Sequence, residues 1–288
     1  MSAIEQYSAP TSLDEAVEIL RTGNVTVFAG GTDVMVQSQI GKVQLKPVLM
    51  NIRRIAGICG IRAEGGTIRI GALTTMTELL DSALVRERLG ILREACDHFA
   101  SDQLRNAATL GGNICNASPA GDTLVPLLVL NARVALVSKP NGSISRRTVP
   151  LAEFFAGPGR THRQPGELLT EIEFPEPPAG FHGMFFKFGT RPALDIATIS
   201  IGLGAVRDAG KLRDVRVAYG SVAPTPIRGP LTEAALEGRT LDTQTIEAAL
   251  GAAAEETHPI SDVRASGWYR SEMIRNTLRR MLSHVHQG

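Results

Sequence analysis

The first stretch with a clear pattern, residues 12–23, places apolar side chains at the spacing of one helix face. Ser12 and Glu15 stand three residues apart at its start, as in a capping box, and Gly23 follows its end. Residues 25–29 are apolar and β-branched, which predicts a strand. This strand leads directly into two adjacent glycines.

Between residues 50 and 175 the patterns predict short elements of both kinds. We expect a hairpin around 64–66, helices after Thr75, over 87–97 and over 123–130, strands over 133–138 and 168–174, and a second hairpin at 141–142. A second pair of adjacent glycines, within 109–113, is expected to form a loop like the first. No regular alternation of strand, helix and strand is visible in the N-terminal part of the chain as a whole, up to residue 175.

The segment 175–180, PEPPAG, is the most proline-dense of the chain and predicts a domain boundary. Three strand-like runs follow, with a turn at 208–211 between the last two, and then helical patterns around 233–236, 245–256 and 268–283. Strands followed by helices indicate an α+β arrangement. We therefore expect domains at 1–176 and 177–288.

Composition and charge narrow the class of protein. The chain has 288 residues, 43% of them hydrophobic and 20% charged, with a formal net charge of +1 and no long basic run. These values are typical of a globular protein and argue against nucleic acid or an anionic membrane as the main partner. The longest apolar run, 124–130, is too short for a transmembrane segment, and the start has no signal-peptide pattern. A cytoplasmic protein is expected.

The three cysteines, Cys59, Cys96 and Cys115, are isolated from one another and form no C-x-x-C pair. This spacing argues against a disulfide framework, a zinc site or an iron–sulfur cluster held by this chain. We therefore assign no metal ligands.

The two glycine pairs carry the candidate chemistry. Glycines after a strand permit positive φ and let a ligand approach backbone N–H groups, which together form a nest for phosphate. Two such segments converging on one pyrophosphate would suit a dinucleotide. The alternative is a pair of ordinary tight turns. Neither segment matches G-x-G-x-x-G or the P-loop pattern.

Three separated stretches, FAGGTDV, QLRNAATLGGNICNASPAGD and FFKFGTRPALDIATIS, occur in this order along the chain. Together they resemble the FAD-binding medium subunits of the molybdenum hydroxylases, the xanthine dehydrogenase and carbon monoxide dehydrogenase family. The resemblance covers the chain from end to end. It implies a two-subdomain FAD-binding domain of the vanillyl-alcohol-oxidase type, followed by a smaller domain of three antiparallel strands plus helices.

The resemblance also implies which residues contact FAD. Both glycine segments are expected to hold the pyrophosphate, mainly through backbone N–H groups: Phe28, Ala29, Gly30, Gly31, Thr32, Asp33 and Val34 in the first, and Thr109, Leu110, Gly111, Gly112 and Asn113 in the second. Other matched positions are Phe99 and Ile196 beside the flavin ring, Asp122 at FAD hydroxyls, Leu169 as a further contact, and Lys187 near the pyrimidine edge. Asp122 is also placed to cap the helix that follows it.

The function implied is electron transfer, with FAD as the only cofactor of this chain. A large molybdopterin subunit would oxidise the organic substrate, a small subunit with two [2Fe–2S] clusters would pass electrons on, and the FAD would deliver them to an external acceptor. A dimer of such heterotrimers is expected, and no catalytic acid or base is assigned here. The alternatives are a self-contained FAD-dependent oxidoreductase of the same fold, with Cys115 or His98 as candidates for a covalent flavin link, and a nucleotide-binding module without flavin.

Overall fold

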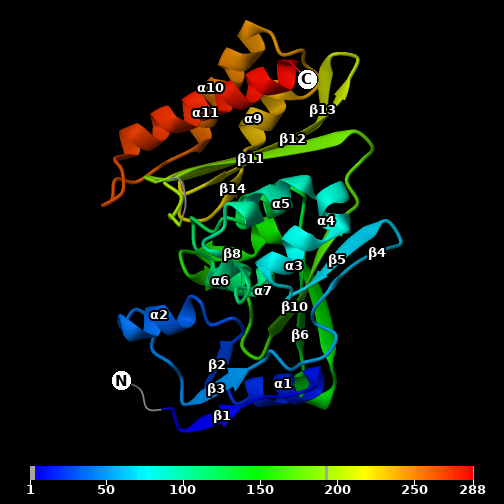
Figure 1. The fold of residues 1–288 in the computed structure, drawn as a ribbon, viewed down its shortest axis with the longest axis vertical. Coiled ribbons are helices and arrows are strands. Elements are labelled where there is room, and N and C mark those ends of the chain that lie inside the picture. The colour runs from blue at the N-terminus through cyan, green and yellow to red at the C-terminus, as the bar shows by residue number, and fades with distance from the viewer. Residues whose placement is uncertain (1–3, 192–193, 288) are drawn as a thin grey trace.

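The computed structural model describes residues 4–191 and 194–287. Its elements form three units that follow one another along the chain (Figure 1). A small N-terminal unit lies at the bottom of this view, a larger unit built on a five-stranded sheet lies in the middle, and the C-terminal unit lies on top. Each unit has its own hydrophobic cluster.

The N-terminal unit alternates strand and helix: β1 (Gln6–Ser8), α1 (Leu13–Leu20), β2 (Val25–Phe28), α2 (Val34–Gln39) and β3 (Val48–Asn51). Its three strands are parallel in the order β1-β3-β2. The expectation of no regular alternation is thus wrong for this unit, because three- and four-residue strands are too short to display a period. Helix α1 begins as expected after Ser12, although Glu15 accepts from the N–H of Thr11 rather than of Ser12.

The middle unit contains an antiparallel sheet in the order β4-β5-β10-β6-β7. The strands are β4 (Ile61–Glu64), β5 (Thr67–Gly71), β6 (Arg133–Ser138), β7 (Ser145–Pro150) and β10 (Leu168–Pro175). Helices α3 (Met76–Asp81), α4 (Ala83–Arg88), α5 (Gly90–Asp97), α6 (Asp102–Arg105), α7 (Leu110–Asn116) and α8 (Leu124–Val129) accompany it, with a ribbon of β8 (Phe155–Gly157) and β9 (Arg160–Thr161).

Both predicted hairpins of the middle unit are confirmed, and the strand over 133–138 is found with those bounds. The helix expected over 87–97 is divided at Leu89 into α4 and α5. The second glycine pair does not form a loop after a strand. It lies in the first turn of α7, whose N-cap is Thr109.

The C-terminal unit is an antiparallel sheet covered on one side by helices (Figure 1). The three expected strands are β11 (Phe181–Phe188), β12 (Ile199–Asp208) and β13 (Lys211–Gly220), and a short fourth, β14 (Ile227–Arg228), extends the sheet. Helices α9 (Pro230–Leu236), α10 (Thr243–Glu256) and α11 (Gly267–Gln287) follow. The other face of the sheet packs on α5 and α8, where Gly183 and Gly202 leave room for Ile91 and Val125.

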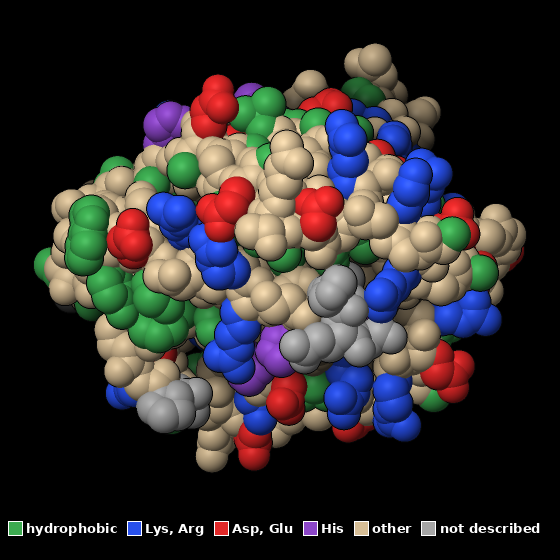
Figure 2. Space-filling view, turned by 90° about the horizontal axis from the view of Figure 1, so that it is seen from above, with side chains coloured by type: hydrophobic (Ala, Val, Ile, Leu, Met, Phe, Trp, Pro, Cys, Tyr) green, Lys and Arg blue, Asp and Glu red, His purple; other side chains and the backbone are tan. Residues whose placement is uncertain are grey.

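Figure 2 shows the upper face of the molecule, with basic and acidic side chains interspersed across it. Hydrophobic side chains gather at its left edge. The start of α11 and the segment before it leave large apolar residues exposed, among them Val263 and Trp268. Within the described residues, no helix combines the length and apolar character needed to cross a bilayer.

Candidate functional site

A cleft of about 580 Å³ lies between the N-terminal and middle units. It brings together most of the residues expected to contact FAD, although they come from distant parts of the chain. These are Ala29, Gly30, Gly31, Thr32, Asp33, Val34, Phe99, Thr109, Gly111, Gly112, Asn113 and Leu169. The two glycine segments therefore face one shared space.

The first glycine segment leaves a row of backbone donors unused. In the described part of the chain, no group accepts a hydrogen bond from the N–H groups of Gly30 to Asp33. Gly31 has φ of +76°, and a Cβ added there would overlap the ring of Phe28. Free N–H groups at such a turn form a concave site for an anion such as phosphate.

Glycine is also required at two close backbone contacts made by residues that line the cleft. A Cβ at Gly30 would overlap the carbonyl oxygen of Ala107, and one at Gly111 would lie 2.7 Å from the Cβ of Ala72. Across the cleft, Gln37 Nε2 donates to Asn116 Oδ1 at 3.0 Å, joining α2 to α7. The glycines thus allow two backbones to approach closely, in addition to any role toward a ligand.

In contrast to the first glycine segment, the second has backbone N–H groups that are already hydrogen-bonded within the protein. The N–H of Leu110 donates to Thr74 O and that of Gly111 to Ala72 O, both at 2.9 Å. The N–H of Gly112 donates to Thr109 Oγ1 at 3.1 Å, the capping bond of α7. The expectation that both segments offer free N–H groups is therefore wrong for these positions, because their donors are used within the protein.

Three basic side chains that are not among the expected FAD contacts also line the cleft: Lys42, Lys46 and Arg163. Lys46 Nζ donates to Gly23 O at 2.8 Å, and Arg163 Nη1 donates to Glu167 O at 2.8 Å, so both are held in place. Asp33 is the one acid among the lining residues, and burial raises the pKa of its carboxyl group. The cleft therefore carries a surplus of positive charge, which suits a pyrophosphate.

No local signal identifies these three cations, since all of them lie on segments that connect helices and strands. Lys42 and Lys46 follow α2, whereas Arg163 follows β9, more than a hundred residues further along the chain. Only the packing of the N-terminal unit against the β9–β10 connection brings them to one space.

Some of the expected residues lie outside the lining of the cleft. Leu110 is fully buried in the core of the middle unit, and the ring of Phe28 packs beneath Gly31. Ile196 is half-exposed in the segment before β12. For these residues a contact with FAD stays a prediction.

Asp122 and Lys187 form a buried ion pair outside that lining. Lys187 Nζ donates to Asp122 Oδ2 at 2.7 Å and to His98 O at 3.1 Å, next to Phe99 at the cleft. Burial raises the pKa of Asp122 to about 6 although Lys187 opposes the shift. Its Oδ1 is buried and has no partner within the described residues, so one acceptor of this carboxylate is left unsatisfied.

Comparison with known proteins now identifies the class. Residues 2–177 match the family model described as "FAD binding domain in molybdopterin dehydrogenase", and residues 184–285 match "CO dehydrogenase flavoprotein C-terminal domain". The chain belongs to this family of FAD-binding medium subunits of molybdenum-containing dehydrogenases, and FAD is its cofactor. The expected α+β fold, a FAD-binding domain followed by a C-terminal domain, is confirmed.

Individual relatives span nearly the whole chain. The xanthine dehydrogenase FAD-binding subunit of Escherichia coli O157:H7 is 33% identical over 282 residues, covering 97% of this chain and 95% of the relative. The carbon monoxide dehydrogenase medium chain of Hydrogenophaga pseudoflava is 31% identical over 280 residues, covering 96% of each. A solved structure of carbon monoxide dehydrogenase from that organism aligns with a TM-score of 0.91 at 32% identity, covering 97% of this chain and 96% of that one.

Proposed function

We propose that this chain is the electron-transfer FAD subunit of a three-subunit molybdenum hydroxylase. The observation that carries the proposal is the cleft, which is lined both by the segment with unused N–H groups and by three basic side chains. Such a site is built for the two negative charges of a pyrophosphate. Bound FAD supplies the exchange of electrons between one-electron and two-electron carriers.

The residues of this chain would bind and orient the cofactor. The N–H groups of Gly30 to Asp33 would donate to phosphate oxygens, and Lys42 and Arg163 would balance their charge. The second segment would form the opposite wall through Thr109 and Asn113. No side chain is assigned as a catalytic acid or base.

We propose that Asp122 and Lys187 bind the part of FAD that carries the flavin ring. The unpartnered Oδ1 of Asp122 would accept from a hydroxyl of FAD, while its Oδ2 keeps Lys187 in place. Because Lys187 is paired with Asp122, the two side chains together present little net charge to the flavin ring. Lys187 would orient the cofactor more than it would alter its reduction potential.

The partners proposed are a large subunit that binds molybdopterin and a small subunit with two [2Fe–2S] clusters. The solved relative is described as lacking "the Mo-pyranopterin moiety of the molybdenum cofactor", which supports a molybdenum-dependent assembly for that relative. Electrons would pass from the clusters to FAD and then to an external acceptor, with two heterotrimers forming a dimer. Within this chain we propose a boundary between residues 176 and 177, close to where the two family matches part.

Co-expression with the flanking genes tests the assembly. We expect three chains to purify together, with flavin and iron–sulfur absorbance in the visible region and oxidation of an organic substrate. The chain expressed alone should show flavin bands and oxidise no organic substrate. Robust turnover of such a substrate by the isolated chain would contradict the proposal.

A self-contained flavin enzyme is the second candidate, and one observation keeps it in view. Cys115 is a free cysteine that lines the cleft, so a thioether to the flavin is geometrically open to it. Denaturation of the purified protein separates the two cases. Flavin that remains attached to the unfolded chain, and is released by Cys115→Ser, would favour the second candidate; complete release of flavin favours the first.

A further inference from the structure

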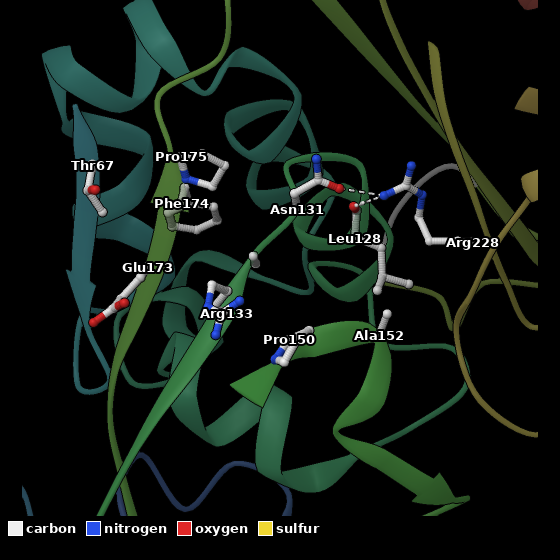
Figure 3. Close-up of a pocket in the computed structure, with 11 residues that line it drawn as sticks. Thr67, Leu128, Asn131, Arg133, Pro150, Ala152, Glu173, Phe174, Pro175 and Arg228 are labelled. Carbon is white, nitrogen blue, oxygen red and sulfur yellow. Dashed lines mark hydrogen bonds between the residues drawn. The ribbon is translucent and has the colours of Figure 1, made fainter. Parts of the chain in front are cut away.

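A second cavity, of about 410 Å³, lies on the side of the large sheet where the middle and C-terminal units meet (Figure 3). Its walls come from the ends of β5, β6 and β10, from α8, and from β14 of the C-terminal unit. It shares no lining residue with the cleft proposed for FAD. Nothing in the proposed electron-transfer function makes use of it.

One charged group in this cavity has no counter-ion. The exposed side chain of Arg133, at the first position of β6, has no hydrogen-bond or ion-pair partner among the described residues. In Figure 3 it lies between Pro150 and the Phe174–Pro175 segment. Glu173 stands directly opposite Arg133 in the strand register, where a cross-strand ion pair would be expected.

That ion pair does not form because other arginines occupy the carboxylate. Glu173 binds both Arg69 and Arg146, the latter at 2.6 Å, and those two arginines also bind Glu171. The glutamates of this sheet face are thus already satisfied. Arg133 is a surplus cation at the edge of this cluster.

The other cation of the cavity is neutralised by its neighbours. Arg228 Nε donates to Glu233 Oε1 at 2.7 Å. Figure 3 shows its two other contacts, in which Nη1 donates to Asn131 Oδ1 at 2.5 Å and to Leu128 O at 3.3 Å. These contacts tie β14 to the end of α8. The unbalanced charge of the cavity is therefore that of Arg133.

Most of the remaining lining residues are apolar: Leu128, Ala132, Pro150, Ala152, Phe174 and Pro175. Thr67, Asn131 and Glu173, whose carboxylate is already paired with Arg69 and Arg146, complete the lining. The cavity is of the size that small-molecule sites have, and a single cation beside apolar walls matches an acid with an apolar body. We propose that it binds a small organic monocarboxylate, with the carboxylate on the guanidinium of Arg133 and the apolar body against Phe174 and Pro150. Arginine suits this task because its planar fork can bind a carboxylate with two parallel hydrogen bonds.

The test is calorimetric titration of the flavin-loaded protein with three probes, benzoate, phenylacetate and hexanoate, and with neutral benzamide as the uncharged counterpart. At least one carboxylate should bind saturably with one site per chain, and benzamide should bind at least tenfold more weakly than benzoate. Arg133→Met should lower the affinity at least tenfold. Arg54→Met, which removes another exposed arginine that lies outside the cavity and has no partner among the described residues, should leave it unchanged.

A second variant distinguishes binding inside the cavity from simple attraction of a carboxylate to an exposed charge. Ala152→Phe should block binding while Arg133 remains, because the added ring would occupy the cavity from an exposed position on its wall. The flavin spectrum of each variant reports independently on folding and on the FAD cleft. No saturable binding of any of the three carboxylates, or equal binding by the wild type and Arg133→Met, would overturn the proposal even if the FAD function holds.

Discussion

At the scale of single residues, two glycines with the same φ distinguish the cost of a left-handed backbone from the cost of a steric clash. Gly31 and Gly23 both have φ of +76°, but a Cβ at Gly31 would overlap the ring of Phe28, whereas a Cβ at Gly23 meets nothing within 4 Å. Alanine at either position pays a left-handed backbone cost of roughly 1–2 kcal/mol. Only at Gly31 must the ring of Phe28, or the segment that carries the free N–H groups, also shift.

We therefore expect Gly31→Ala to lose most of its FAD and Gly23→Ala to retain it. The measurement is the ratio of flavin to protein absorbance after purification, with melting temperature as the check on folding. If both variants lose flavin equally, general destabilisation is the cause and the assignment of the first segment to the pyrophosphate is wrong.

At the scale of elements, α7 holds one wall of the FAD cleft through its N-cap. Thr109 Oγ1 accepts from the N–H of Gly112, and its loss should cost about 1 kcal/mol of unfolding free energy. Thr109→Ala should also weaken FAD binding, because Thr109 and Gly112 line the cleft. Urea unfolding and FAD titration of the apoprotein measure the two effects.

Ser101→Ala is the matched control for this element. Ser101 caps α6 by accepting from the N–H of Leu104, and neither residue lines the cleft. We expect a comparable loss of stability without a change in FAD affinity. An unchanged FAD affinity in Thr109→Ala would leave the cap with a purely structural role.

At the scale of the whole molecule, the pair Asp122–Lys187 joins the middle unit to the C-terminal sheet. Burial raises the pKa of Asp122 to about 6 in the folded protein, above its ordinary value of 3.8. The folded state then binds more protons than the unfolded state between these values. The stability that Asp122 contributes is full below about pH 4 and is lost as the pH rises through about 6.

Asp122→Asn should remove this dependence. Between pH 4 and 7, the unfolding free energy of the apoprotein should fall less with rising pH in the variant than in the wild type. Asp208→Asn, at the exposed last residue of β12, is the control and should follow the wild type. Parallel curves for wild type and Asp122→Asn in urea unfolding at each pH would contradict the raised pKa.

The features that could be predicted from the sequence were local ones. The strand at 133–138, the hairpin at 64–66 and the helix after Ser12 each depend on residues close together in the chain. The loop predicted for the second glycine segment is wrong, because Leu110 and Gly111 lie in α7 and donate to Thr74 and Ala72, partners more than thirty residues away. The parallel sheet β1-β3-β2 was missed for a similar reason, because its short strands are defined by their pairing.

The order of the motifs along the chain was enough to determine the family, the FAD cofactor and the α+β division. The reason is that a motif is defined by the types of its residues and their spacing, and neither depends on how the chain packs. Tertiary structure alone decided which N–H groups remain free and that Asp122 pairs with Lys187. It also decided that Lys42 and Arg163 line one cleft and that Arg133 lacks a counter-ion among the described residues. Each of these features depends on which hydrogen-bonding and charged groups, distant in sequence, are brought together. Folding places some of these groups within hydrogen-bond distance of a partner and buries others.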